Sequence, residues 1–99
     1  MANKLTGWSG PRVDDLAGIQ KICDEVKSKL EEWTGKTYVD YKAVLYRSQL
    51  ETGVNYVIKV YCGVEDYIHL CLVRRSPEGY LRVLHVEQQR MKESPLFTF

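Results

Sequence analysis

A single amphipathic stretch near the start of the chain limits the possible folds more than any other feature. Its apolar residues recur at helical spacing and form one stripe: Leu16, Ile19, Ile22, Cys23, Val26, Leu30 and Trp33. Asp14 and Asp15 suit the start of this helix, and Gly35 suits its end. A helix of about 20 residues is about 30 Å long. Because it has one apolar face, it needs a sheet to lie on.

The rest of the chain supplies the strands of that sheet. Four segments are rich in β-branched and aromatic residues, largely in alternation: 38–48, 55–62, 67–75 and 81–87. The connections between them are short and carry turn residues such as Gly63 and Gly79, so neighbouring strands should be antiparallel. The sequence therefore predicts an α+β fold, with one long helix lying across a four- to five-stranded antiparallel sheet.

The length of 99 residues fits one domain, residues 1–99, and is too short for two. Residues 1–12 contain Gly7, Gly10 and Pro11 and carry no helical or strand pattern. We therefore expect residues 1–12 to be a mobile N-terminal arm.

Charge and hydropathy exclude several classes of partner. Fourteen basic and thirteen acidic residues give a net charge of +1, which provides little attraction to nucleic acid or to an anionic membrane. No apolar run of about 18 residues is present, and the first residues lack the apolar core of a signal peptide. With an odd number of cysteines, three, these features predict a cytoplasmic protein with reduced thiols.

The residues offer little for catalysis. His69 and Cys71 share one face of a strand, but a nucleophilic cysteine usually stands at a turn or helix N-terminus that helps ionise it. Cys62 and Cys71 flank a turn, and placing Cys62 opposite Tyr67 leaves an offset of about 13 Å, beyond disulfide reach. We expect no catalytic residue, no metal site and no cofactor.

Two further groups of residues have ordinary structural explanations. The arginines late in the chain lack interleaved aromatic residues, so a solvated sheet edge accounts for Arg74, Arg75, Arg82 and Arg90. By its residues alone, the segment 49–53 is a hairpin loop that ends in glycine.

Several segments together resemble the stefins, the type 1 cystatins, over nearly the whole chain. The helix segment 22–32 (ICDEVKSKLEE) is similar to the helix of that family. The segments 41–44 (YKAV), 53–60 (GVNYVIKV) and 67–70 (YIHL) resemble its strands, and Phe99 also fits. No single segment is specific, but their combination is.

The resemblance implies a reversible, competitive, non-covalent inhibitor of papain-like cysteine proteases of the cathepsin type. In the family the protease groove is blocked by an arm with a glycine hinge and by two hairpin loops. The positions that match are Gly7 with its neighbour Trp8 in the arm, Gln49, Leu50, Glu51, Thr52 and Gly53 in the first loop, and Ser76 and Pro77 in the second. Gly10 is the alternative to Gly7 as the hinge.

The chain departs from the family pattern at the tips of both loops. Leu50, Glu51 and Thr52 replace Val, Val and Ala, and Ser76 stands where leucine is typical. These departures leave an alternative function open: a binding module that kept the fold and lost or weakened protease inhibition. The resemblance also implies a monomer that can form a domain-swapped dimer when the first loop opens.

Overall fold

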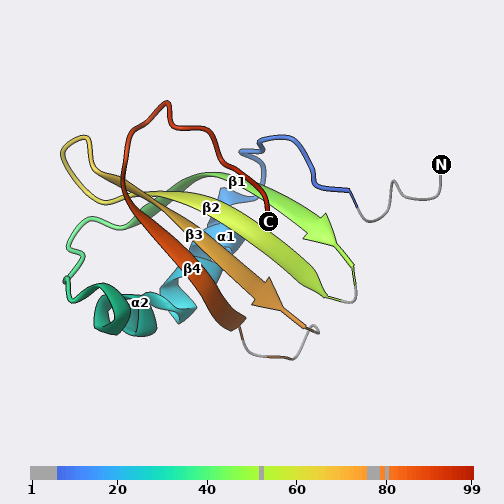
Figure 1. Ribbon diagram of the computed structural model, residues 1–99, viewed down its shortest axis with the longest axis horizontal. Coiled ribbons are helices and arrows are strands. Elements are labelled where there is room, and N and C mark those ends of the chain that lie inside the picture. The colour runs from blue at the N-terminus through green and yellow to red at the C-terminus, as the bar shows by residue number, and fades with distance from the viewer. Residues whose placement is uncertain (1–6, 52, 76–78, 80) are drawn as a thin grey trace.

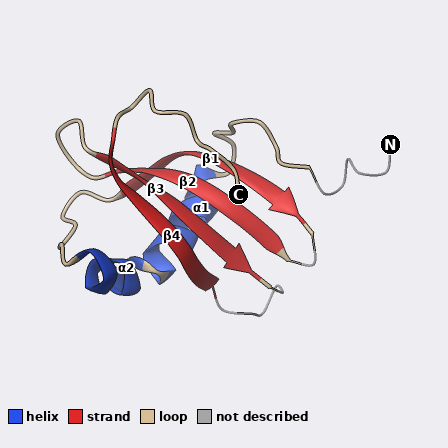
Figure 2. Ribbon diagram, in the orientation of Figure 1, coloured by secondary structure: helices blue, strands red, loops and turns tan. Residues whose placement is uncertain are grey.

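The computed structural model describes residues 7–51, 53–75, 79 and 81–99, and shows helices packed on an antiparallel sheet (Figures 1 and 2). The elements in chain order are α1 (Leu16–Glu25), α2 (Lys27–Thr34), β1 (Lys42–Leu50), β2 (Val54–Tyr61), β3 (Tyr67–Arg74) and β4 (Leu81–Arg90). The four strands follow one another across the sheet in the order β1-β2-β3-β4. The predicted α+β fold with an antiparallel sheet is confirmed.

The expectation of one long helix is wrong in one detail, because the helical segment is divided at Val26. The backbone of Val26 has φ −103° and ψ 3°, and its N–H donates to the Cys23 carbonyl three residues back. Leu30 then donates to the Val26 carbonyl, so the regular pattern resumes in α2. The tightened turn changes the direction of the axis, and the buried side chains of Cys23 and Leu30 both reach the core. The spacing of apolar residues along the sequence does not reveal a break of the helix at a single residue.

The ends of the helical segment match the sequence signals. The Asp15 side chain accepts a hydrogen bond from the Gly18 N–H at 3.3 Å and serves as the N-cap of α1. Gly35 ends α2 in the left-handed conformation, with φ 75°, and its N–H donates to the Glu31 carbonyl. The predicted start and end of the helical region are therefore confirmed.

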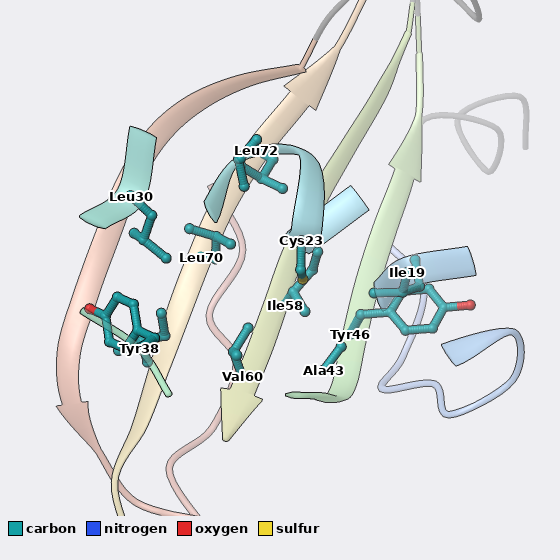
Figure 3. Packing of buried hydrophobic residues seen from close by; sticks show 12 residues of the cluster. Ile19, Cys23, Leu30, Tyr38, Ala43, Tyr46, Ile58, Val60, Leu70 and Leu72 are labelled. Carbon is teal, nitrogen blue, oxygen red and sulfur yellow. The ribbon is translucent and has the colours of Figure 1, made fainter. Parts of the chain in front are cut away.

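The main core lies between the helices and one face of the sheet (Figure 3). It contains apolar residues from both helices and from three strands, among them Ile19, Cys23, Leu30, Tyr46, Ile58, Leu70 and Leu72. The side chain of Gln20 fastens α1 to the start of β1, because it donates to the Tyr41 carbonyl and accepts from the Ala43 N–H. This packing fixes the position of β1, from which the candidate site is built.

The turn between β2 and β3 differs from the expected register by one residue. The Cys62 N–H donates to the Asp66 carbonyl, so Tyr61 rather than Cys62 lies opposite Tyr67. Cys71 pairs with Val57 and is remote from Cys62 along the hairpin. The three cysteines are free thiols, as expected.

A second, smaller apolar cluster lies on the opposite face of the sheet. Strand residues alternate between faces, and Val57 and Cys71 point away from the helices toward Leu96. The segment 91–99, which follows β4, crosses this face toward β1 in Figure 1. No helix in the described part of the chain is long and apolar enough to span a membrane.

Candidate functional site

Those residues singled out by the sequence that the structure describes gather at one edge of the sheet, at the strand ends where β1 joins β2 and β3 joins β4. We call this edge, made by Trp8, the tip of the β1–β2 hairpin and the flanks of the β3–β4 connection, the loop edge. It lies opposite the β2–β3 turn (Figure 1). In a meander of antiparallel strands, alternate connections must lie at the same end. The topology therefore brings together positions 8, 49–51, 53, 75 and 79.

The first hairpin remains paired almost to its tip. Gln49 and Leu50, which the sequence placed in the loop, belong to β1 and lie opposite Asn55 and Val54. The Asn55 side chain donates to the Gln49 side-chain carbonyl at 2.8 Å, and the Glu51 N–H donates to the Gly53 carbonyl at 2.8 Å. These bonds fix the described residues on either side of the tip.

Gly53 links the two hairpins through close backbone contact. A Cβ built on Gly53 would lie 2.7 Å from the Cα of Arg75 and would also overlap the carbonyl oxygen of Arg74. A side chain has no room at this point, so only glycine allows the two chain segments to approach this closely. The position of the first hairpin is thereby tied to the end of β3.

The flanks of the second connection are held by Arg74. Its guanidinium donates to the Gly79 carbonyl at 2.6 Å and to the Glu25 carboxylate of α1 at 2.8 Å. The predicted residues Ser76 and Pro77 lie outside the described residues, as does Thr52 in the first loop. Arg74 thus connects the base of the second loop to the helix.

The start of the described chain is bound along the free edge of β1. Trp8 bridges to Gln49, and the Ser9 N–H donates to the Ser48 carbonyl at 2.8 Å. Arg12 forms the next bridge, to Tyr46. Both hinge candidates are exposed, and a Cβ on Gly10 would meet nothing within 4 Å.

The tip of the first hairpin is exposed and carries mixed chemistry. Leu50 is 62% exposed, and Glu51 is also exposed. Beside them, a hollow of about 270 Å³ is lined by Glu51, Gly53, Asn55, Val73, Arg75, Arg82 and Leu84. The loop edge therefore offers an apolar side chain, a carboxylate and two arginines to a partner.

The burial of His69 and Cys71 argues against a thiol catalyst. Burial lowers the pKa of His69 to about 4 and raises the pKa of Cys71 to about 11. A reactive cysteine needs a thiolate stabilised by a nearby cation, which requires the opposite shifts. The Cys71 side chain packs with Leu96 of the segment 91–99, and His69 pairs with Glu87 of β4. The described residues contain no cluster of His, Cys, Asp and Glu that could hold a metal.

Sequence reasoning missed the part played by Arg47 and the segment 91–99. Arg47 lies on the same face of β1 as Gln49, and its side chain donates to the carbonyls of Ser9 and Leu96. The ring of Phe99 lies against Trp8, with ring centroids 5.1 Å apart. The sequence signals were the apolar residues Leu96, Phe97 and Phe99 after the last strand, and the resemblance of Phe99 to the stefin pattern.

Comparison with known proteins gives consistent matches. A family model for the cystatin domain matches residues 11–76. Cystatin-B of Oplegnathus fasciatus is 35% identical over 101 residues, covering 100% of each chain. Leukocyte cysteine proteinase inhibitor 1 of Sus scrofa is 39% identical over 82% of this chain and 81% of the relative. Stefin-C of Bos taurus is 44% identical over 74% of this chain and 71% of the relative.

Proposed function

The chain belongs to the cystatin family, within its stefin branch, and from that premise we propose that it inhibits papain-like cysteine proteases reversibly, competitively and without a covalent bond. The family consists of cysteine protease inhibitors rather than enzymes, and its partners are cysteine proteases. We propose that its targets are of the cathepsin type.

The observation that carries this proposal is the convergence at the loop edge. Trp8 bridges to Gln49, and Gly53 lies against Arg75, so the start of the described chain, the first hairpin and the end of β3 are in direct contact. We propose that the arm and the two hairpins form one ridge there, and that this ridge enters the protease groove. Its binding residues would be those singled out by the family pattern: Gly7, Trp8, Gln49, Leu50, Glu51, Thr52, Gly53, Ser76 and Pro77.

The construction of the first hairpin suits a blocker. The Gln49–Asn55 side-chain bond and the bond from Glu51 to Gly53 hold the tip before any partner arrives. A rigid tip loses little conformational freedom on binding, which favours affinity. Such a tip can fill the groove above the reactive cysteine without laying an extended scissile bond across it.

A second candidate function rests on Glu51. The exposed carboxylate stands at the apex, where the family pattern has an apolar residue, and a groove partly closed to water would desolvate it. A fold that binds another partner, with weak or absent protease inhibition, would tolerate such a charge. Ser76, in place of leucine, motivates the same alternative.

The proposal also covers the domain organisation, the oligomeric state and the cellular compartment. We propose that residues 1–99 act as one domain, as a monomer in the cytoplasm. The three free thiols, Cys23, Cys62 and Cys71, support a reducing compartment, because oxidising compartments favour paired cysteines.

A titration against a papain-like protease tests the proposal. We expect complete, reversible inhibition whose apparent constant rises with substrate concentration, as competition requires. Mass spectrometry of the recovered chain should show neither cleavage nor an adduct. Absence of inhibition at high micromolar concentration would favour the binding module, and steady hydrolysis of the chain would make it a substrate.

A further inference from the structure

The segment 91–99 forms a strap across the sheet face opposite the helices, and its backbone is held by two buried or half-buried side chains. The ammonium group of Lys59, in β2, donates to the carbonyls of Lys92 and Ser94, the latter at 2.7 Å. Arg47, in β1, donates to the Leu96 carbonyl at 2.9 Å. The Leu96 side chain is 5% exposed. The strap is therefore docked on the sheet along most of its length.

The far end of the strap reaches the arm. The rings of Phe99 and Trp8 meet edge to face, with centroids 5.1 Å apart and planes at 67°. Trp8 also packs on the cluster of Val57, Cys71 and Leu96. The first part of the described chain and the last part thus share one packing site, although they are about 90 residues apart in the sequence.

Arg47 joins the same two segments through hydrogen bonds. Its Nε atom donates to the Ser9 carbonyl at 2.9 Å, while its Nη1 atom donates to the Leu96 carbonyl. The planar guanidinium fixes both acceptors in one geometry, which a lysine could not do. The arm is therefore attached to the strap as well as to the edge of β1.

We propose that Phe99 and Arg47 are positioning residues for the N-terminal arm, acting on the protease through Trp8. The proposal rests on the proposed inhibitory function and adds to it the part of the chain that aims the arm. Holding Trp8 against the sheet fixes the position of its side chain at the loop edge. A side chain that is already held has fewer conformations to lose when it binds.

The first test measures the position of Trp8 without any protease. The chain has two tryptophans, so Trp33→Phe makes Trp8 the only reporter. In that background, Phe99→Ala should increase acrylamide quenching of Trp8 and lower its fluorescence anisotropy. Phe97→Ala is the matched control, because Phe97 is 69% exposed and belongs to the same strap. Unchanged Trp8 fluorescence in Phe99→Ala would overturn the proposal that Phe99 holds Trp8 in place, whatever the inhibition assay shows.

The second test measures inhibition. An edge-to-face aromatic pair contributes modestly, so Phe99→Ala should raise the inhibition constant about two- to tenfold, mainly through faster dissociation. Phe97→Ala should leave it unchanged. In a Trp8→Ala background, Phe99→Ala should have no further effect, which a general loss of stability would not produce. Arg47→Lys should also raise the inhibition constant, as Phe99→Ala does.

The outcomes separate the two proposals. If the parent protein does not inhibit, the proposed function fails. The quenching data alone then decide whether Phe99 holds Trp8 in place. If the parent inhibits and Phe99→Ala frees Trp8 without changing the dissociation rate, the positioning role is overturned. Thermal unfolding of each variant shows that it is folded, and Phe99→Leu, which keeps apolar bulk, should lie between the parent and Phe99→Ala in both tests.

Discussion

At the residue scale, three positions contribute most to the shape and charge of the loop edge. Gly53 has no space for a side chain, Gln49 is bonded across the hairpin, and Glu51 places a charge at the apex. Elsewhere, His69 is a buried base without a hydrogen-bond partner for either ring nitrogen among the described residues. Each of these features leads to a measurable expectation.

Substitution of Gly53 by alanine should damage both stability and inhibition. The added methyl group would overlap the backbone at Arg74 and Arg75, so the two hairpins must separate. We expect a loss of about 1–3 kcal/mol in the free energy of unfolding, the usual cost of overpacking. Chemical denaturation measures it, with Gly10→Ala as the control because that site is open. Equal stability of the two variants would contradict the close contact.

Substitution of Glu51 by valine should tighten inhibition of a generic papain-like protease. The carboxylate must lose water when the tip enters the groove, and the thiolate of the protease repels it. We expect a gain of about 1–3 kcal/mol, or roughly 5- to 150-fold in the dissociation constant. Assays on several proteases should include one with a basic groove rim, where the gain should be smaller. If no protease responds, Glu51 does not lie at the contact surface.

The buried His69 should make the protein less stable in mild acid. Burial and the neighbouring Lys59 lower the pKa of His69 to about 4, although Glu87, 3.6 Å away, opposes this shift, while Arg90 adds to it. Since the unfolded chain then binds the proton more readily than the folded one, stability falls as the pH drops from about 6.5 to 4. The loss should reach up to about 3 kcal/mol.

Urea denaturation across that pH range checks the expectation for His69. His69→Gln should flatten the pH dependence, even if it lowers stability at every pH. His85→Gln provides the comparison with an exposed histidine, because the His85 side chain is 62% exposed. An unaltered slope in His69→Gln would show that other groups cause the acid sensitivity.

At the scale of elements, the arm and the hairpins are built differently. The first hairpin is closed by strand pairs up to Leu50 and Val54, and Gly53 in its tip is packed on the end of β3. Residues 8–12 instead attach to one free strand edge, through bridges at Trp8 and Arg12. We therefore expect the arm to act on binding separately from the hairpins.

Deletion of residues 1–6 should weaken inhibition mainly through faster dissociation. These residues precede the Trp8 anchor, so the hairpins can still meet the protease and the association rate should change little. Stopped-flow association and displacement measurements separate the two rates. The intact chain with Gly7→Ala provides a comparison that tests the hinge. An inhibition constant unaffected by the deletion would remove the arm from the mechanism.

At the scale of the whole molecule, the sheet is covered on both faces and along one edge. The helices cover one face, the strap covers part of the other, and residues 8–12 protect the edge of β1. Free strand edges invite pairing with other chains, so this cover favours a monomer. The first hairpin is the place where the architecture could still open, because β1 and β2 would form one continuous strand if the tip straightened.

We expect a slowly forming, temperature-dependent dimer that exchanges the helices and β1 between protomers. Straightening the tip at Glu51–Gly53 would destroy the ridge of the loop edge, so the dimer should inhibit poorly. Size-exclusion chromatography after incubation at increasing temperature, with an inhibition assay on each peak, tests this expectation. A dimer as inhibitory as the monomer would contradict it.

The sequence by itself determined the order of elements, the α+β class and the family. Helical spacing, strand alternation and turn residues such as Gly35 are local signals, because they reflect contacts within one element or between neighbours. The same local signals located the first loop, with Gly53 at its end. They placed Gln49 and Leu50 outside β1, since cross-strand bonds have no signature in the spacing of residues.

Only the tertiary structure decided how the candidate site is held together. The break at Val26, the contact of Gly53 with Arg75 and the strap that joins Phe99 to Trp8 all depend on how separate elements pack. Arg47 is the clearest case, because its two acceptors, Ser9 and Leu96, lie 38 and 49 residues away in the sequence. Contacts of that range follow from the packing of the arm and of the segment 91–99 on the sheet, and a periodic pattern carries no information about them.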